Sequence, residues 1–239
     1  MIDLSSSGMD LRFDEDDCRI VGFDGDKDVR RLRDMKEMFL QTEEGVDVLY
    51  YMFRGVDLFD SIRYDITVLL PGTVGKEYIK TKGHYHPDSY PEVYEVIKGS
   101  ALYLLQRSEE PYDLVDDVII VEAKAGDKVV IPPHYGHVTI NSGEDVLIMS
   151  NLVSTMFSSI YEPYEIKKGA AYYITVDGVI KNRNYEKLPY VKRAKPREAK
   201  SMGVIKNMPL HTSISEDRGR FEYLNHGDEY KFSNVFEFE

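Results

Sequence analysis

Two histidines and a glutamate stand close together in the segment TKGHYHPDSYPEVYEVIKG, residues 81–99. His84 and His86 are two residues apart, and Glu92 lies six residues beyond His86. Residues i and i+2 of a strand point to the same face of a sheet, so both imidazoles can meet one ion. A short loop that contains prolines can bring Glu92 back beside them as the next strand begins.

A third histidine, His137, lies far along the chain in GDKVVIPPHYGHVTIN. Barrel closure would let its strand lie beside the first pair. Two or three neutral imidazoles and one carboxylate suit Fe(II), Mn(II), Ni(II) or Zn(II) and leave positions open for water or substrate oxygens. An H-x-H pair alone is a weak signal, because exposed paired histidines are common. His134 is expected in a pocket wall or on the surface, and His211 and His226 on the surface or in packing.

The chain around these residues has the sequence pattern of an all-β protein. Short β-rich runs such as IRYDITVLL, EVYEVIKG, SALYLLQR and DVLIMSNLV follow one another, separated by turn signals such as Pro71-Gly72 and Ser142-Gly143. Many short strands at close spacing predict an antiparallel sandwich or barrel. No alternation of strands and helices is present, which argues against a doubly wound sheet.

Three segments are predicted. Residues 1–45 form an N-terminal arm and an amphipathic helix over DKDVRRLRDMKEMFL, where Val29, Leu32 and Met35 recur at helical spacing. Residues 46–190 form the barrel that carries the metal site. Residues 191–239 form a C-terminal extension that covers the barrel, reaches a partner subunit or is partly disordered.

Composition excludes several classes. The 239 residues carry a net charge of −12, which argues against nucleic acid as a partner, because phosphate contacts need clustered Lys and Arg. Cys18 is the only cysteine, so a Cys-based zinc site and an intrachain disulfide are excluded. No signal peptide or membrane span is read from the sequence. We therefore expect a cytoplasmic protein with no membrane partner.

The two histidine segments together resemble the two motifs of the cupins. The first is glycine, H-x-H, glutamate and glycine, here Gly83, His84, His86, Glu92 and Gly99. The second is glycine, proline, histidine and asparagine, here Gly126, Pro132, His137 and Asn141. Cupins are double-stranded β-helix barrels, which agrees with the many short strands that the sequence predicts. The resemblance therefore implies a cupin barrel with an N-terminal helix and a C-terminal extension.

The resemblance narrows to the archaeal, cupin-type glucose-6-phosphate isomerases. It is carried by DVRRLRDM, ITVLLPGTVGKEYIKTKGHYH, EVYEVIKG and IPPHYGHVTIN. It covers about residues 28–161, with weaker similarity to about Val191. The final fifty or so residues lie beyond the usual length of that family.

What the resemblance implies for the site can be stated by residue. One divalent metal per subunit, with iron expected first, would be bound by His84, His86, Glu92 and His137. Thr67, Thr81 and Gly83 would contact the phosphate, and Tyr50, Tyr94 and Tyr161 would line the pocket. Two positions depart from the family. Val153 stands where a tyrosine is found and Ser159 where a histidine is found, which puts the closure over the phosphate in doubt.

The implied activity is interconversion of glucose 6-phosphate and fructose 6-phosphate, a step of glycolysis and gluconeogenesis. One route passes through a cis-enediol with Glu92 as base and Tyr94 as an orienting or relaying hydroxyl. A hydride shift is the other route, and the sequence does not choose between them. Ring opening also needs an acid or base, for which His134 and Tyr135 are candidates.

Other readings stay open at this point. The chain could be a non-catalytic cupin that binds a sugar phosphate, or another metal cupin such as a mannose-phosphate isomerase or a dioxygenase. A small-molecule sugar phosphate is the expected ligand. A homodimer is the expected assembly, since unpaired sheet edges favour strand exchange.

Overall fold

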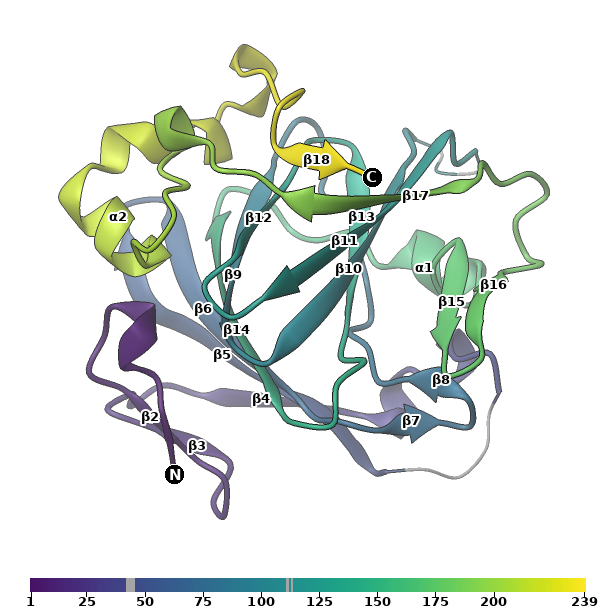
Figure 1. Ribbon diagram of the computed structural model, residues 1–239, viewed down its shortest axis with the longest axis horizontal. Coiled ribbons are helices and arrows are strands. Elements are labelled where there is room, and N and C mark those ends of the chain that lie inside the picture. The colour runs from purple at the N-terminus through teal and green to yellow at the C-terminus, as the bar shows by residue number, and fades with distance from the viewer. Residues whose placement is uncertain (42–45, 111, 113) are drawn as a thin grey trace.

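Two main β-sheets build the molecule (Figure 1). The structure is a computed structural model, and it describes residues 1–41, 46–110, 112 and 114–239. The larger sheet has the strand order β12-β9-β14-β6-β5-β4. Its strands are β4 (Lys27–Arg31), β5 (Val48–Phe59), β6 (Ile62–Leu69), β9 (Glu92–Lys98), β12 (Lys128–Ile131) and β14 (Leu147–Ser154).

The second sheet has five strands in the order β13-β10-β11-β17-β18. They are β10 (Ser100–Arg107), β11 (Asp117–Lys124), β13 (Tyr135–Ile140), β17 (Val191–Pro196) and β18 (Phe236–Phe238). Buried apolar side chains of both sheets, among them Ile66, Leu105 and Leu152, belong to one core cluster. The predicted all-β class is therefore confirmed. Strands from outside residues 46–190 also join the two sheets: β4 belongs to the larger sheet, and β17 and β18 belong to the second.

Two smaller sheets and short helices complete the fold. One sheet joins β1 (Ile2–Asp3), β2 (Arg12–Asp14) and β3 (Arg19–Val21), and the other joins β7 (Thr73–Val74), β8 (Glu77–Tyr78), β15 (Tyr172–Thr175) and β16 (Gly178–Lys181). The α-helices are α1 (Glu162–Ile166) and α2 (Leu210–Glu216), and the 3₁₀ helices are η1 (Ser5–Ser7), η2 (Leu32–Asp34), η3 (Lys36–Met38), η4 (Lys200–Met202), η5 (Arg218–Leu224) and η6 (Gly227–Glu229). In the described part of the chain, no helix is long and apolar enough to cross a membrane.

The amphipathic helix predicted near the N-terminus is wrong. The segment instead forms strand β4, which pairs antiparallel with β5, followed by the 3₁₀ turns η2 and η3. Leu32, Met35 and Met38 are buried at a spacing of three. A 3₁₀ helix repeats every three residues, so a spacing of three places side chains on one face of a 3₁₀ helix just as it does in an α-helix. The residues before these turns, Lys27–Arg31, are extended because their backbone hydrogen bonds pair them with β5.

The C-terminal extension covers the barrel. β17 adds in parallel to β11, and β18 adds to β17, as Figure 1 shows. Phe221, Tyr223 and Leu224 of η5 are fully buried in the core cluster. At the start of α2, the Leu210 amide donates to the buried Glu95 carboxylate at 2.8 Å. Of the three roles considered for this segment, the fold therefore shows the first.

Candidate metal centre

One face of the six-stranded sheet supplies most of the pocket that holds the histidine cluster. Alternate residues of a strand share a face. The pocket is lined from β5 by Tyr50, Met52 and Arg54, from β6 by Arg63, Asp65 and Thr67, from β14 by Met149, Asn151 and Val153, and from β9 by Glu92 and Tyr94. Strand pairing fixes their order across the sheet, with Val153 opposite Arg63 on one side and opposite Glu92 on the other.

The remaining walls come from the segment before β9 and the segment before α1. Thr81, Lys82, Gly83, His84, His86, Ser159 and Tyr161 line them. His84 reaches the cluster because its backbone forms an antiparallel bridge with His137 of β13. The predicted placement of the distant histidine strand beside the first pair is therefore found in the fold.

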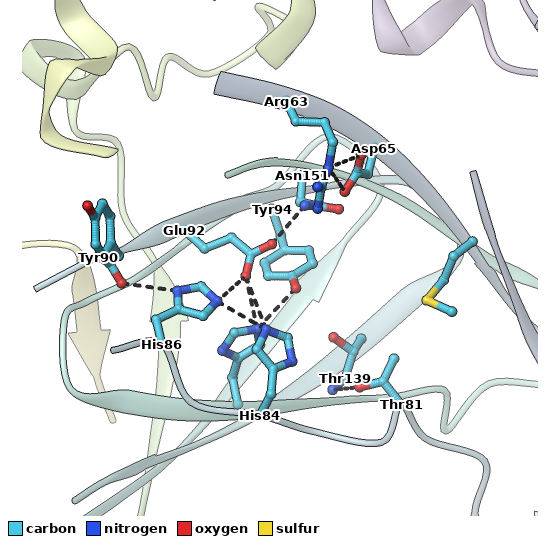
Figure 2. A network of polar contacts seen from close by, with 12 residues as sticks. Arg63, Asp65, Thr81, His84, His86, Tyr90, Glu92, Tyr94, Thr139 and Asn151 are labelled. Atoms are coloured by element: carbon cyan, nitrogen blue, oxygen red, sulfur yellow. Dashed lines mark hydrogen bonds and ion pairs between the residues drawn. The ribbon is translucent and has the colours of Figure 1, made fainter. Parts of the chain in front are cut away.

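Four predicted residues converge on one point. Ligand atoms of His84, His86, Glu92 and His137 all lie within 4.8 Å of one another. His84 Nε2 lies 3.0 Å from His86 Nε2. Glu92 Oε2 lies 3.1 Å from His137 Nε2, 3.3 Å from His86 Nε2 and 3.9 Å from His84 Nε2. Figure 2 shows the rings of His84 and His86 and the Glu92 carboxylate pointing toward one another.

The neighbours of the cluster leave these atoms available to a cation. The Nδ1–H of His86 donates to the Tyr90 carbonyl at 3.0 Å, so the Nε2 of the neutral ring keeps its lone pair. Asn151 Nδ2 donates to Glu92 Oε1 at 2.7 Å. Glu92 Oε2 is buried and has no hydrogen-bond partner among the described residues. Converging lone pairs of this kind are stable only around a positive charge.

The spacing of the ligand atoms also fits a metal ion. With bonds of ~2.1 Å, ligand atoms at right angles are ~3.0 Å apart and opposite ones ~4.2 Å apart. The nitrogen–nitrogen and nitrogen–oxygen distances quoted above fall between these limits. The three imidazoles and one carboxylate are thus a donor set that fits a divalent transition metal with positions left open.

Electrostatics keep the cluster in its metal-binding protonation state. Burial favours the neutral carboxyl of Glu92, but its interactions with His137 and His86 outweigh burial and hold the pKa well below its usual range. Burial, together with the neighbouring His137 and His86, lowers the pKa of His84 well below its ordinary value. A carboxylate and a neutral imidazole are the forms that bind metal.

Tyr94 stands beside the cluster, as its place on the strand face of Glu92 predicts. Its hydroxyl lies 3.0 Å from His137 Nε2. Burial and the charge of Glu92 raise the pKa of Tyr94 well above its ordinary value, so the hydroxyl keeps its proton. Tyr94 can therefore donate a hydrogen bond into the pocket.

The remaining predicted residues also reach the pocket. The Tyr50 hydroxyl accepts from the Lys82 amide at 3.2 Å, and the Tyr161 ring lies 5.4 Å from the His84 ring. Thr81 Oγ1 accepts from the Thr139 amide at 2.9 Å, which leaves its own O–H to donate. Gly83 has a φ of +80°, and a Cβ there would meet Val138 Cγ2 at 2.5 Å, so both conformation and packing require glycine.

Two candidates, His134 and Tyr135, do not line the pocket. His134 is exposed, and Tyr135 donates its hydroxyl to Asp117 at 2.8 Å, so the structure does not bring either ring-opening candidate to the cluster. Lys82 lines the pocket, but its ammonium lies 2.5 Å from Glu165. His211 packs against Phe59 and Tyr64, as expected of a packing residue.

Sequence reasoning missed four polar residues of the pocket, namely Arg54, Arg63, Asp65 and Asn151. A signal for three of them was present. Arg63 and Asp65 alternate with Thr67 in IRYDITVLL, and Arg54 alternates with Tyr50, so each set must share a face.

Comparison with known proteins agrees with this geometry. Fold and site define a cupin-type barrel protein with a three-histidine, one-carboxylate cluster. The family model described as glucose-6-phosphate isomerase (GPI) matches residues 35–190. The chain belongs to this glucose-6-phosphate isomerase family.

Curated relatives carry the same name. The glucose-6-phosphate isomerase of Thermococcus litoralis is 37% identical over 132 residues, which cover 51% of this chain and 66% of the relative. That of Thermococcus kodakarensis is 32% identical over 163 residues, which cover 64% of this chain and 82% of the relative. The chain thus spans slightly less than two thirds of the first of these relatives.

Solved structures give more distant matches. An oxalate oxidase matches with a TM-score of 0.35 and 20% identity, covering 44% of this chain and 48% of that one. The Lactobacillus farciminis oxalate decarboxylase formate complex matches with a TM-score of 0.37 and 23% identity, covering 47% of this chain and 31% of that one.

Proposed function

We propose that this protein is a metal-dependent isomerase that interconverts glucose 6-phosphate and fructose 6-phosphate, a step of glycolysis and gluconeogenesis. The observation that carries the proposal is the convergence of three imidazoles on Glu92 Oε2 inside a pocket that also holds hydroxyls and cations. Family membership supports the same activity.

One divalent metal ion per subunit is proposed at His84, His86, Glu92 and His137. Fe(II) is expected first, with Mn(II), Ni(II) and Zn(II) as alternatives for the same donor set. When bound, the ion would supply Lewis acidity to the two sugar oxygens between which the carbonyl moves.

Glu92 is proposed as the base. Its carboxylate takes the proton from C2 of the aldose while O1 receives a proton, which gives a cis-enediol. Return of the first proton to C1, while O2 gives up its proton to replace the one that O1 received, gives the ketose. The lowered pKa keeps Glu92 ionised at neutral pH, as a base must be. Tyr94 orients the sugar hydroxyls or relays a proton, and its raised pKa suits a donor.

The phosphate end of the sugar is proposed to lie among Thr67, Thr81 and Gly83. Both threonine hydroxyls can donate, and the Gly83 amide has no acceptor among the described residues. Tyr50 and Tyr161 would bound the pocket on either side.

A coupled assay tests the activity. Fructose 6-phosphate conversion is followed through reduction of a nicotinamide cofactor by an added glucose-6-phosphate dehydrogenase. Turnover is expected with metal, loss with EDTA, and recovery when Fe(II) or Mn(II) is restored. Metal-loaded protein without turnover would contradict the isomerase proposal and favour a non-catalytic sugar-phosphate cupin.

Metal content tests the ligand assignment separately. His84→Ala is expected to lower the bound metal, whereas His134→Ala, which alters an exposed histidine outside the pocket, should leave it unchanged. Elemental analysis after gel filtration measures both variants. Full metal content in His84→Ala would show that the assignment is wrong.

Assembly is a further proposal. We expect a homodimer, and light scattering at micromolar concentration measures it. A monomer under those conditions would contradict this expectation.

A further inference from the structure

Two arginines stand on the pocket wall formed by β5 and β6. Arg54 and Arg63 both line the pocket, and both lie within electrostatic range of the buried Asp65 carboxylate. Asp65 is 6% exposed. Two guanidinium groups around one carboxylate leave one positive charge that this carboxylate does not compensate.

Asp65 holds Arg63 in one orientation. The Arg63 Nε–H lies 2.8 Å from both Asp65 oxygens, and the Gly55 amide donates to Asp65 Oδ1 at 2.8 Å. Figure 2 shows this pair beside Asn151 on the wall that also carries Glu92. The terminal nitrogens of Arg63 have no hydrogen-bond partner among the described residues, so up to four N–H groups remain free.

The Arg63 guanidinium contacts its carboxylate partner through fewer nitrogens than the guanidinium of Arg107 does in a structural ion pair elsewhere in the protein. Arg107 meets Asp116 through Nε at 2.8 Å and Nη2 at 3.0 Å, which occupies one edge of its fork. Arg63 gives Asp65 only its Nε, and 29% of its side chain is exposed. A guanidinium that is anchored at one atom and free at the others is arranged to receive a planar or tetrahedral anion.

Arg54 has one carboxylate partner within ion-pair distance, Asp28, and two further partners, the Tyr161 hydroxyl and the Met52 sulfur. Its Nε lies 3.2 Å from Asp28 Oδ2, but 41% of the Arg54 side chain and 62% of the Asp28 side chain are exposed. Exposed pairs of this kind contribute ~0–1 kcal/mol and exchange readily. Lys82, the other cation of the pocket lining, is paired with Glu165.

Arg63 and Glu92 belong to the same pocket wall. Arg63, Val153 and Glu92 lie opposite one another on three neighbouring strands, so the backbones of Arg63 and Glu92 are two strand spacings, ~9.6 Å, apart. The small Val153 side chain between them leaves room for the carbon chain of the substrate.

We propose that Arg54 and Arg63, gathered around Asp65, complete the subsite that includes Thr67, Thr81 and Gly83, and supply the positive charge that binds the phosphate monoester dianion of the substrate. Thr67 on the same face of β6 adds a hydroxyl. The identity of the sugar rests on the proposed function, but binding of a phosphate group to these arginines does not require turnover.

The test begins with inorganic phosphate and protein freed of metal with EDTA, in a titration calorimeter. Wild-type protein is expected to bind phosphate. Arg63→Met and Arg54→Met should each weaken binding by about tenfold to a hundredfold, the range of a charged hydrogen bond. Asp65→Asn should weaken it as well, because it releases the orientation of Arg63.

Arg107→Met is the matched control, because it breaks an arginine–aspartate pair outside the pocket and should leave phosphate affinity unchanged. Arg63→Lys keeps the charge but not the fork, so partial binding is expected. This variant keeps the test decisive if Arg63→Met does not fold. Equal phosphate affinity in Arg63→Met and wild-type protein, or no phosphate binding by wild-type protein, would overturn the proposal.

Kinetics give a second measurement. Arg63→Met is expected to raise the KM for fructose 6-phosphate at least tenfold while kcat stays within about threefold, because a remote binding group acts on both ground and transition states. Arginine-dependent phosphate binding without any sugar-phosphate turnover would support the subsite and count against the isomerase. A fall in kcat with unchanged KM would contradict the subsite.

Discussion

The two oxygens of Glu92 have different surroundings. Oε1 accepts a hydrogen bond from Asn151, whereas Oε2 faces the three imidazoles. Glu92→Gln keeps the shape of the side chain but removes the charge of the proposed metal ligand and the proposed proton acceptor. We expect turnover to fall at least a hundredfold, within the range of a lost general base.

The coupled assay measures this loss, with bound metal determined in the same sample. Glu122→Gln, which alters a surface pair with Arg193, is the control and should keep full activity. A Glu92→Gln protein with full metal and full rate would show that Glu92 is neither a ligand nor a base.

Asn151 positions Glu92 for the proposed metal. Its amide holds Oε1 away from the cluster, so Oε2 alone faces the histidines. Asn151→Ala is expected to weaken metal binding by about tenfold to a hundredfold, as loss of a residue that orients a ligand does. Competition with a chelator measures the affinity, and the visible spectrum of the Co(II)-loaded protein reports any change in coordination.

Asn141→Ala separates orientation from packing. Asn141 is equally buried, but its amide donates to the Leu69 and Asp145 carbonyls and not to a ligand. This variant should lose stability and keep its metal affinity. If both variants lost metal affinity equally, Asn151 would have only a structural role.

The predictability of the site differs from residue to residue. The four cluster residues were predictable, because two motifs specify them together. Arg54 was predictable as well, because it follows Tyr50 and Met52 at alternate positions of β5 and so shares their face. Asn151 meets Glu92 only through the register of β14 on β9, which the sequence does not state.

At the scale of elements, η6 packs on the loop before β9. A Cβ on Gly227 would lie 1.9 Å from the Ser89 carbonyl oxygen and 2.9 Å from Pro91 Cδ. The same loop presents the Tyr90 carbonyl that fixes the His86 ring. Gly227→Ala must therefore displace the loop, and we expect a loss of about 1–3 kcal/mol of stability, together with weaker metal binding.

Urea unfolding and chelator competition measure the two effects. Gly219→Ala is the matched control in the same segment, because its Cβ would approach only Asp217 Oδ1, at 3.3 Å. Reduced stability with unchanged metal affinity in Gly227→Ala would mean that η6 does not position His86.

Glu95 ties α2 to the barrel. Its carboxylate accepts from the Leu210 amide and lies 3.0 Å from the Lys128 ammonium. Burial raises the pKa of Glu95 in spite of Lys128. Between the ordinary and the raised pKa, the folded protein holds a proton that the unfolded chain has lost, so stability falls as the pH rises through this window.

Glu95→Gln removes this titration. The free energy of unfolding of wild-type protein minus that of the variant should fall as pH rises above the ordinary carboxyl range, and then level off. Urea denaturation at a series of pH values measures the difference. A difference that rises with pH in this window would contradict a raised pKa.

The elements themselves were predictable only where patterns are local. The barrel strands follow from alternation and turn residues. The prediction of an N-terminal α-helix was wrong because a spacing of three is compatible with both an α-helix and a 3₁₀ helix. η5 has no local signature either. Phe221 and Tyr223 are buried only because a distant barrel surface receives them, and the sequence does not state that contact.

On the scale of the whole molecule, residues 191–239 belong to the barrel. β17 protects the edge of β11, and η5 and Phe236 enter the core cluster. A chain that ends at Tyr190 would leave the β11 edge and this apolar surface open to water. We expect it to aggregate, or to melt at a much lower temperature than the full chain, because exposed edges and apolar patches drive association.

Soluble yield, light scattering and thermal unfolding measure this outcome. A chain that ends at Pro196 keeps β17 and loses the segment that carries η5 and β18. Comparing the two truncated chains therefore separates the effect of losing β17 from the effect of losing η5 and β18. If edge protection dominates, this chain stays soluble and loses stability. If the truncation at Tyr190 gave a dispersed protein with unchanged melting and turnover, the extension would be an accessory to the barrel, and the burial of its aromatic residues would contribute little to folding.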